Sequence, residues 1–143
     1  MKKGIAFIVA ILFIITGGTA LAASYKPAKL PDAPADYQKK KNPLKSKKKI
    51  VKDGGKIYKR KCKKCHGEAG DGQGSAAGDL GYAPTAFSKP GYLKGRSDGQ
   101  LFFIIEKGSA GTDMEAMGKG TAVNLSEEEI WKVITFMRKE FTK

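Results

Sequence analysis

Between residues 50 and 143, the apolar positions recur at the spacing of α-helices. The first helix is predicted from about residue 48 to the two cysteines, on the apolar residues Ile50, Ile57, Tyr58 and Cys65. Gly54 and Gly55 would each weaken this helix by roughly 1 kcal/mol relative to alanine. We therefore expect a side chain of another helix to approach the backbone at these glycines.

Two further helices have clear boundaries. Ser97 and Asp98 can cap a short apolar helix that ends at Gly108. The last helix has Ser126 at its N-cap and Glu129 three residues later, the pattern of a capping box. Its apolar stripe consists of Ile130, Val133, Ile134, Phe136 and Met137.

The segments between these helices are rich in glycine. Residues 67–84 and 108–124 contain few large apolar residues and are predicted to be loops. No segment alternates with a period of two, so we predict an all-α fold with three to five short helices. Such short helices bury little surface by themselves, and a large apolar cofactor would supply the missing core.

The first 22 residues have the pattern of a signal peptide. Lys2 and Lys3 precede an apolar run over residues 5–15, and residues 20–22 read Ala-Leu-Ala, with small residues where a signal peptidase cuts. We predict cleavage after Ala22. The alternative is an uncleaved anchor, since a membrane span needs about 20 apolar residues. Either reading predicts export, and a periplasmic or otherwise exported location.

Residues 23–49 are predicted to be a flexible arm, and residues 50–143 the folded domain. The arm is rich in lysine and proline and poor in large apolar residues, so it can bury too little surface to offset its ordering entropy. The chain has a formal net charge of +13, and much of this charge lies in the arm. Export argues against nucleic acid as its partner. Three interpretations of the arm remain open. It binds anionic lipid headgroups, which would give peripheral membrane association; it binds an acidic protein; or it is a plain charged spacer.

The candidate chemistry lies in the run Cys62-Lys63-Lys64-Cys65-His66, which has the form C-x-x-C-H. This is the attachment signature of c-type haem, in which two thiols bond to the haem and the adjacent histidine binds the iron. A thioredoxin-like redox pair would need a β-α-β context, which the pattern lacks. A structural zinc site needs four ligands, and the chain has only two cysteines and one histidine.

The single histidine also restricts the second axial ligand of the iron. Because His66 is the only histidine, this chain cannot supply two histidine ligands. Methionine, lysine, water or an open position remain. Met114 and Met117 lie in the glycine-rich loop 108–124, whereas Met137 lies on the apolar face of the last helix. A loop methionine without a packing partner favours ligation, and His/Met ligation raises the reduction potential.

Three motifs occur in order along the domain. They are Gly54-x-x-x-Tyr58-x-x-x-Cys62-x-x-Cys65-His66, Gly111-Thr112-x-Met114, and the last helix with Val133 and Phe136. Over about residues 50–143 the chain thereby resembles the class I cytochrome c family, and in particular its small bacterial monohaem members. The resemblance implies a small cytochrome c fold wrapped around one covalently bound haem c.

The resemblance also implies roles for particular residues. Val133 and Phe136 would cross the first helix near Gly54 and Tyr58. Met114 would be the axial ligand in preference to Met117, and the carbonyl of Pro84 would accept a hydrogen bond from Nδ1 of His66. Many relatives have proline after the axial methionine, and Glu115 stands there in this chain. The implied haem contacts are Cys62, Cys65, His66, Met114 and Pro84, with His66 and Met114 as iron ligands.

The resemblance implies an electron carrier rather than an enzyme. Two strong axial ligands leave no open position for a substrate. The basic residues beside the attachment site could steer redox partners with acidic docking surfaces, or they form an ordinary solvated helix face. They are Lys59, Arg60, Lys61, Lys63 and Lys64. Two alternatives remain, a subunit of a larger membrane redox complex and a haem sensor or enzyme with an open sixth position.

Overall fold

The structure is a computed structural model that describes residues 29–142, and these residues form helices and loops without a strand. The all-α prediction is confirmed. The helices are α1 (Ala35–Gln38), α2 (Lys48–Lys61), α3 (Lys63–His66), the 3₁₀ turn η1 (Ala77–Asp79), α4 (Asp98–Lys107) and α5 (Glu127–Phe141). The predicted signal peptide, residues 1–22, lies outside the described residues. None of the helices within residues 29–142 is long and apolar enough to cross a membrane.

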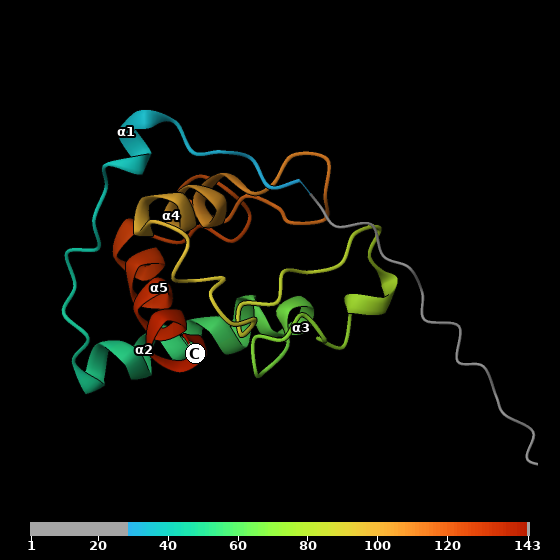
Figure 1. The fold of residues 1–143 in the computed structure, drawn as a ribbon, viewed down its shortest axis with the longest axis horizontal. Helices are drawn as coiled ribbons and strands as arrows, with labels where there is room; N and C mark the ends of the chain where they lie inside the picture. Colours follow the sequence, from blue (N-terminus) through green and yellow to red (C-terminus); the bar gives the residue numbers. More distant parts are fainter. Residues whose placement is uncertain (1–28, 143) are drawn as a thin grey trace, which may run out of the picture.

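Helices α2 and α5 cross at close range, as the glycines of α2 predict (Figure 1). A Cβ atom on Gly54 would lie 2.0 Å from the carbonyl oxygen of Lys132 and 3.0 Å from Cβ of Phe136. The ring of Phe136 also packs on Tyr58, with ring centroids 5.3 Å apart. The backbone of α5 therefore occupies the space that any side chain at position 54 would need.

The two long C-terminal helices begin at the predicted caps. The Ser126 hydroxyl accepts a hydrogen bond from the Glu129 amide, and the Glu129 carboxylate accepts one from the Ser126 amide. The Ser97 hydroxyl caps α4 by accepting from the Gln100 amide at 3.0 Å. Helix α4 ends at Gly108, whose φ of 75° is one that glycine adopts without strain.

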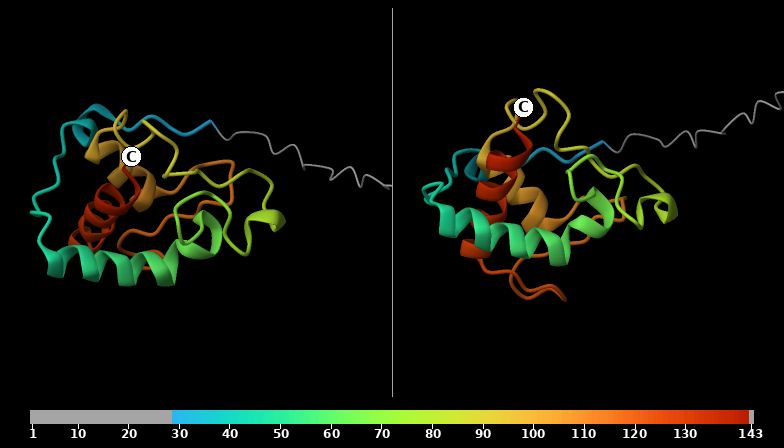
Figure 2. Two further views of the ribbon diagram at one scale, coloured as in Figure 1. Left: turned by 60° about the horizontal axis from the view of Figure 1, so that its bottom comes forward. Right: turned by 90° about the horizontal axis from the view of Figure 1, so that it is seen from below.

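The core lies where α2, α4 and α5 meet. Its most deeply buried large side chains are Tyr58, Phe102, Leu93, Ile130, Ile134 and Val133. Phe102 of α4 packs on Trp131 of α5, with ring centroids 4.4 Å apart. Figure 2 shows α2 running along one side of the molecule, with α5 crossing it and α4 beyond. This frame holds the end of α2, and hence the cysteine motif, against the loops that follow.

The structure differs from the expectation that residues 23–49 form a flexible arm. Residues 29–47, named the strap hereafter, lie against α4 and α5 before the chain enters α2 (Figure 1). Ala33 is buried, and its amide donates to Oε1 of Gln100 at 2.8 Å. Nδ2 of Asn42 donates to Oγ1 of Thr135 at 2.9 Å. The expectation was wrong for this segment because hydrogen bonds to the helices, together with the packing of Tyr37 and Leu44 against the core, hold it.

Candidate functional site

A cavity of about 300 Å³ brings the cysteine motif and the methionine loop together. Cys62, Cys65 and His66 line it from the end of α2 and from α3, and Met114 and Met117 line it from loop 108–124. Apolar residues of the other segments complete the wall, among them Leu80, Phe87, Leu101, Ile104, Ile105, Val123 and Met137. A largely apolar cavity with a few convergent polar groups is the usual form of a cofactor site.

The cysteine motif turns at the junction of α2 and α3. The amide of Cys62 donates to the carbonyl of Tyr58 at 2.8 Å, which completes the last turn of α2. The amide of His66 in turn donates to the carbonyl of Cys62 at 2.9 Å. The motif is thus one continuous helical turn, and its two thiols and imidazole line the same cavity.

The glycine-rich loop after His66 folds back over the motif. The amide of Gly72 donates to the carbonyl of His66 at 2.9 Å, and the amide of Gly74 donates to the carbonyl of Cys65 at 3.1 Å. A Cβ atom on Gly74 would lie 2.2 Å from the carbonyl oxygen of Lys64. Glycine at position 74 therefore allows the loop to lie directly on the motif and to satisfy its carbonyls.

The two cysteines are free thiols, and the environment of Cys62 disfavours its thiolate. Cys62 is buried and Cys65 is half-buried. Burial raises the pKa of the Cys62 thiol to about 12, and the nearby Cys65 adds to the increase. Reactive disulfide-exchange cysteines have a lowered pKa instead. The described residues also contain no group of three or more His, Cys, Asp and Glu side chains suited to a metal ion.

His66 is held in one tautomer by a backbone carbonyl. Its Nδ1 lies 3.1 Å from the carbonyl oxygen of Thr85, and since a carbonyl only accepts, Nδ1 carries the proton. Burial lowers the pKa of His66, while this hydrogen bond acts in the opposite direction. The ring is therefore neutral near pH 7, with Nε2 as its free lone pair, the form in which histidine binds a metal. Phe87 stacks on the ring with centroids 4.5 Å apart.

The carbonyl that accepts the hydrogen bond from His66 Nδ1 belongs to Thr85. The prediction that the Pro84 carbonyl is this acceptor was therefore wrong by one position. The Pro84 carbonyl oxygen points at the glycine loop instead, 2.6 Å from where a Cβ atom of Gly72 would lie. Pro84 still lines the cavity. Neither Thr85 nor Phe87 was predicted from the sequence, and the only available signal was that both closely follow Pro84.

The methionine loop folds back on the end of α4. The amide of Ser109 donates to the carbonyl of Met114 at 2.8 Å, and the Met114 amide donates to the hydroxyl of Thr112 at 3.2 Å. The amide of Met117 donates to the carbonyl of Ile105 at 3.1 Å. Both methionines line the cavity, but only Met117 also packs against the buried core cluster.

The residues of the cavity fit a haem. The paired thiols and the neutral imidazole form the donor set of c-type attachment. The wall is apolar, as a flat macrocycle requires. Ser109 also lines the cavity, and its buried Oγ has no hydrogen-bond partner within residues 29–142. A haem carboxylate would offer this hydroxyl an acceptor.

Comparison with known proteins identifies the family. A family model described as "Cytochrome C oxidase, cbb3-type, subunit III" matches residues 50–137. The chain belongs to this family of cytochrome c domains. The class I resemblance is thus confirmed, and membership implies one covalently bound haem c, for which Cys62 and Cys65 have the required spacing.

Several solved structures are similar to this chain. The Kuenenia stuttgartiensis reducing HAO-like protein complex Kustc0457/Kustc0458 has a TM-score of 0.58 and 26% identity, over 71% of this chain and 47% of that chain. This chain thus spans about half the length of that relative. Cytochrome cL from Methylophaga aminisulfidivorans MPT has a TM-score of 0.48 and 23% identity, over 65% of this chain and 56% of the other. No curated protein matches the chain.

Membership of the cytochrome family implies haem-based electron transfer as the broad function. When bound, haem supplies an iron that gains and loses one electron. Cys62 and Cys65 would hold the cofactor through their two thiols, while the chain keeps His66 in its metal-binding tautomer and surrounds the site with apolar side chains. The strap lies N-terminal to residues 50–137, which the family model matches.

Proposed function

We propose that the protein carries one electron on a haem c whose iron is bound by His66 and Met114, and that it passes this electron between exported redox proteins. The single observation that supports it is the cavity that His66 and Met114 line together. Met114 is favoured over Met117 because Met117 already packs against the core cluster. With both axial positions occupied by protein, the iron has no open position for a substrate.

A visible spectrum tests this ligation. Ferric haem with a methionine ligand has a weak far-red charge-transfer band. We expect the band in the wild-type protein with haem, its loss in Met114→Ala and its retention in Met117→Ala. Loss only in Met117→Ala would assign the ligand to Met117. A wild-type protein without the band would favour the sensor or enzyme alternative, because its sixth position would then be open to a gas or peroxide.

A role within a larger membrane redox complex is the second candidate. The description of the matched family names a subunit of an oxidase, and the first relative above comes from a protein complex. Purification under mild detergent distinguishes the two functions. Co-elution of the haem protein with a membrane oxidase would support the subunit, and elution alone from a soluble fraction would support the shuttle.

We also propose that residues 1–22 direct export, because haem is attached to C-x-x-C-H motifs outside the cytoplasm. The mass of the mature haem protein tests this proposal. Cleavage after Ala22 supports a soluble exported carrier, while the full-length mass in a membrane fraction supports an uncleaved anchor. Full-length protein in the cytoplasmic fraction would contradict export.

The partner surface that we propose is the basic edge beside the haem attachment site. Lys61 is exposed and also lines the cavity, and Lys64 is exposed on α3. Lys59 and Lys63 form ion pairs with Glu68 at 3.7 and 2.8 Å, but these pairs are exposed and hence weak. An acidic partner can replace them, so the edge suits a negatively charged docking surface.

The exposed lysines of the strap are a second surface, suited to peripheral contact with anionic lipid. Vesicles of anionic lipid that failed to bind the protein at low salt would exclude this contact.

A further inference from the structure

We propose that the strap is a wall of the haem cavity, and that Gln100 is the positioning residue that holds this wall in place. This inference rests on the proposed function as a haem carrier. The strap would help to set the reduction potential of the haem. The strap would keep water from the haem, although it lies outside the residues that the family model matches.

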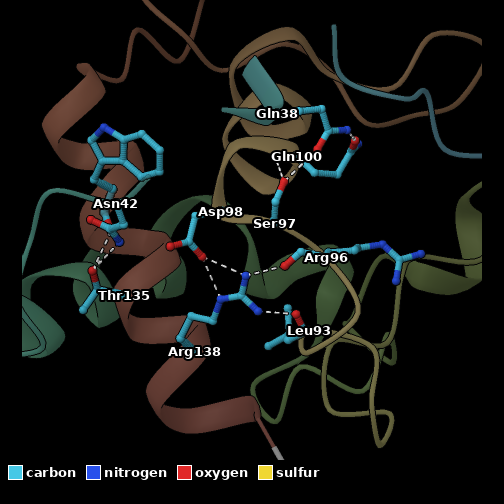
Figure 3. Close-up of polar contacts among 10 residues, drawn as sticks. Gln38, Asn42, Leu93, Arg96, Ser97, Asp98, Gln100, Thr135 and Arg138 are labelled. Atoms are coloured by element: carbon cyan, nitrogen blue, oxygen red, sulfur yellow. Dashed lines mark hydrogen bonds and ion pairs between the residues drawn. The ribbon is translucent and has the colours of Figure 1, made fainter. Parts of the chain in front are cut away.

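Gln100 directs its whole side-chain amide at the strap. It is 8% exposed, and its Nε2 donates to the carbonyl of Pro31 at 2.8 Å. Its Oε1 accepts from the amide of Ala33 at 2.8 Å. It also accepts from Nε2 of Gln38 at 2.8 Å, the contact that Figure 3 shows. A buried amide needs such partners, and here the strap supplies them all. Substitution at Gln100 would therefore leave strap groups without partners.

The neighbouring glycine shows how closely the strap approaches α4. A Cβ atom on Gly99 would lie 1.8 Å from the carbonyl oxygen of Tyr37 and 3.1 Å from that of Lys40. Backbone thus meets backbone at this point, and only glycine permits it. Two successive residues of α4 thus accommodate the strap, Gly99 by having no side chain and Gln100 by its hydrogen bonds.

The strap is held at its other end as well. Nδ2 of Asn42 donates to Oγ1 of Thr135 and to the carbonyl of Trp131, both on α5, as Figure 3 shows for Thr135. The ring of Tyr37 packs edge-on against Phe103 at 5.1 Å, and its hydroxyl donates to Glu106. Contacts with both α4 and α5 fix the path of the strap across the molecule.

This path places Leu30 in the wall of the haem cavity. Leu30 lines the cavity, and it also lines an adjoining hollow between the strap and residues 83–97. That hollow is more polar, with Asp32 of the strap on one side and Lys89 and Arg96 on the other. Leu30 therefore stands between the polar hollow and the cavity. Removing an apolar group from this position would admit water toward the haem.

Water near the haem changes the reduction equilibrium in a known direction. Ferric haem carries one positive charge more than ferrous haem, and water stabilises the more highly charged form. An apolar shell that excludes solvent therefore raises the reduction potential. Gln100 would act on the potential through Leu30, without touching the haem.

The test uses the full mature protein with haem attached, and four variants. Gln100→Ala frees the strap from α4, Gly99→Ala displaces it by a separate contact, and Leu30→Ala shortens the wall without freeing the strap. Asp36→Asn is the matched control, because Asp36 is an exposed strap residue. For each variant we would measure the midpoint potential by redox titration and the hydrogen exchange of the strap amides.

We expect faster exchange of the Ala33 amide in Gln100→Ala and Gly99→Ala. In both variants and in Leu30→Ala, the ratio of reduced to oxidised protein at a fixed potential should fall by about tenfold, which is 59 mV for one electron. Asp36→Asn should change neither quantity, and Leu30→Met should retain the wild-type potential.

Three outcomes would overturn the proposal. The first is a freed strap with an unchanged potential, which would make the strap a purely structural element. The second is an unchanged potential in Leu30→Ala. The third is unchanged Ala33 exchange in Gln100→Ala, which would show that Gln100 does not hold the strap. Each outcome leaves the carrier function intact, whereas a wild-type protein that attaches no haem would contradict that function instead.

Discussion

At the scale of single residues, glycine decides how closely the elements of this protein approach. Gly54 has no room for a side chain, since its Cβ atom would meet backbone of α5 at Lys132. Gly55 differs, because its Cβ atom would meet only the ring of Phe136, at 3.0 Å. A ring can move by a few tenths of an ångström, whereas a helix backbone moves only with the whole helix.

The two glycines therefore make a matched pair of substitutions. We expect Gly54→Ala to lower the free energy of unfolding by about 1–3 kcal/mol, the usual cost of overpacking. Gly55→Ala should be close to neutral, because a better helix propensity of roughly 1 kcal/mol offsets the displacement of the ring. Denaturant unfolding of the haem proteins measures both values. Equal effects of the two substitutions would argue against a close crossing at position 54.

At the scale of the element, α5 depends on the reciprocal cap at its start. The Ser126 amide and hydroxyl both contact the Glu129 carboxylate, which faces solvent on its other side. Helix α5 carries much of the core, including Ile130, Val133 and Ile134. A frayed first turn would therefore loosen the contact with α2 and, through α2, the cysteine motif.

The cap makes a pH-dependent contribution to stability. Hydrogen bonds from the amide and hydroxyl of Ser126 lower the pKa of Glu129 below its ordinary value. A lowered pKa in the folded state stabilises the protein above the unfolded pKa of about 4.3, and this contribution disappears as the pH falls through the folded value. We expect Ser126→Ala to cost about 1 kcal/mol at pH 7.

Stability measured from pH 7 to pH 3 tests this contribution. Glu129→Gln should be less stable than wild type at pH 7, and the difference should shrink below about pH 4.3. A difference that stays constant across this range would show that the carboxylate charge has no part in the cap.

At the scale of the whole molecule, the charge distribution matters because the chain is strongly basic, with a net charge of +13. Lys48 and Lys61 stand at the two ends of α2. Thirteen residue steps separate them, which is about 20 Å along a helix. This separation is about twice the screening length at 0.1 M salt. A charge at one end therefore has little influence at the other.

Small redox reagents can report which end of α2 lies near the haem. We expect Lys61→Glu to slow oxidation of the ferrous protein by anionic ferricyanide severalfold at about 0.1 M salt, and to speed oxidation by a cationic cobalt complex. Lys48→Glu is the control at the far end of the same helix and should change both rates much less. Equal effects of the two substitutions would show that only net charge matters and that the basic edge has no special role.

The sequence alone determined the features that depend on neighbouring residues. The caps at Ser97 and Ser126 are short-range hydrogen-bond patterns. The attachment motif is a single helical turn, and the absence of a second histidine is a property of composition. Even the close crossing at Gly54 was predictable, because a glycine that weakens a helix needs a reason in packing.

Only the tertiary structure decided which distant groups meet. The strap was predicted to be flexible because composition measures apolar content, whereas Gln100 holds it with hydrogen bonds across more than sixty positions. The Thr85 carbonyl, rather than that of Pro84, accepts the hydrogen bond from His66. The path of residues 67–97 directs the Thr85 carbonyl toward the imidazole and the Pro84 carbonyl away from it. A backbone that must satisfy its buried polar groups selects partners by their position in space, and a linear pattern does not encode that position.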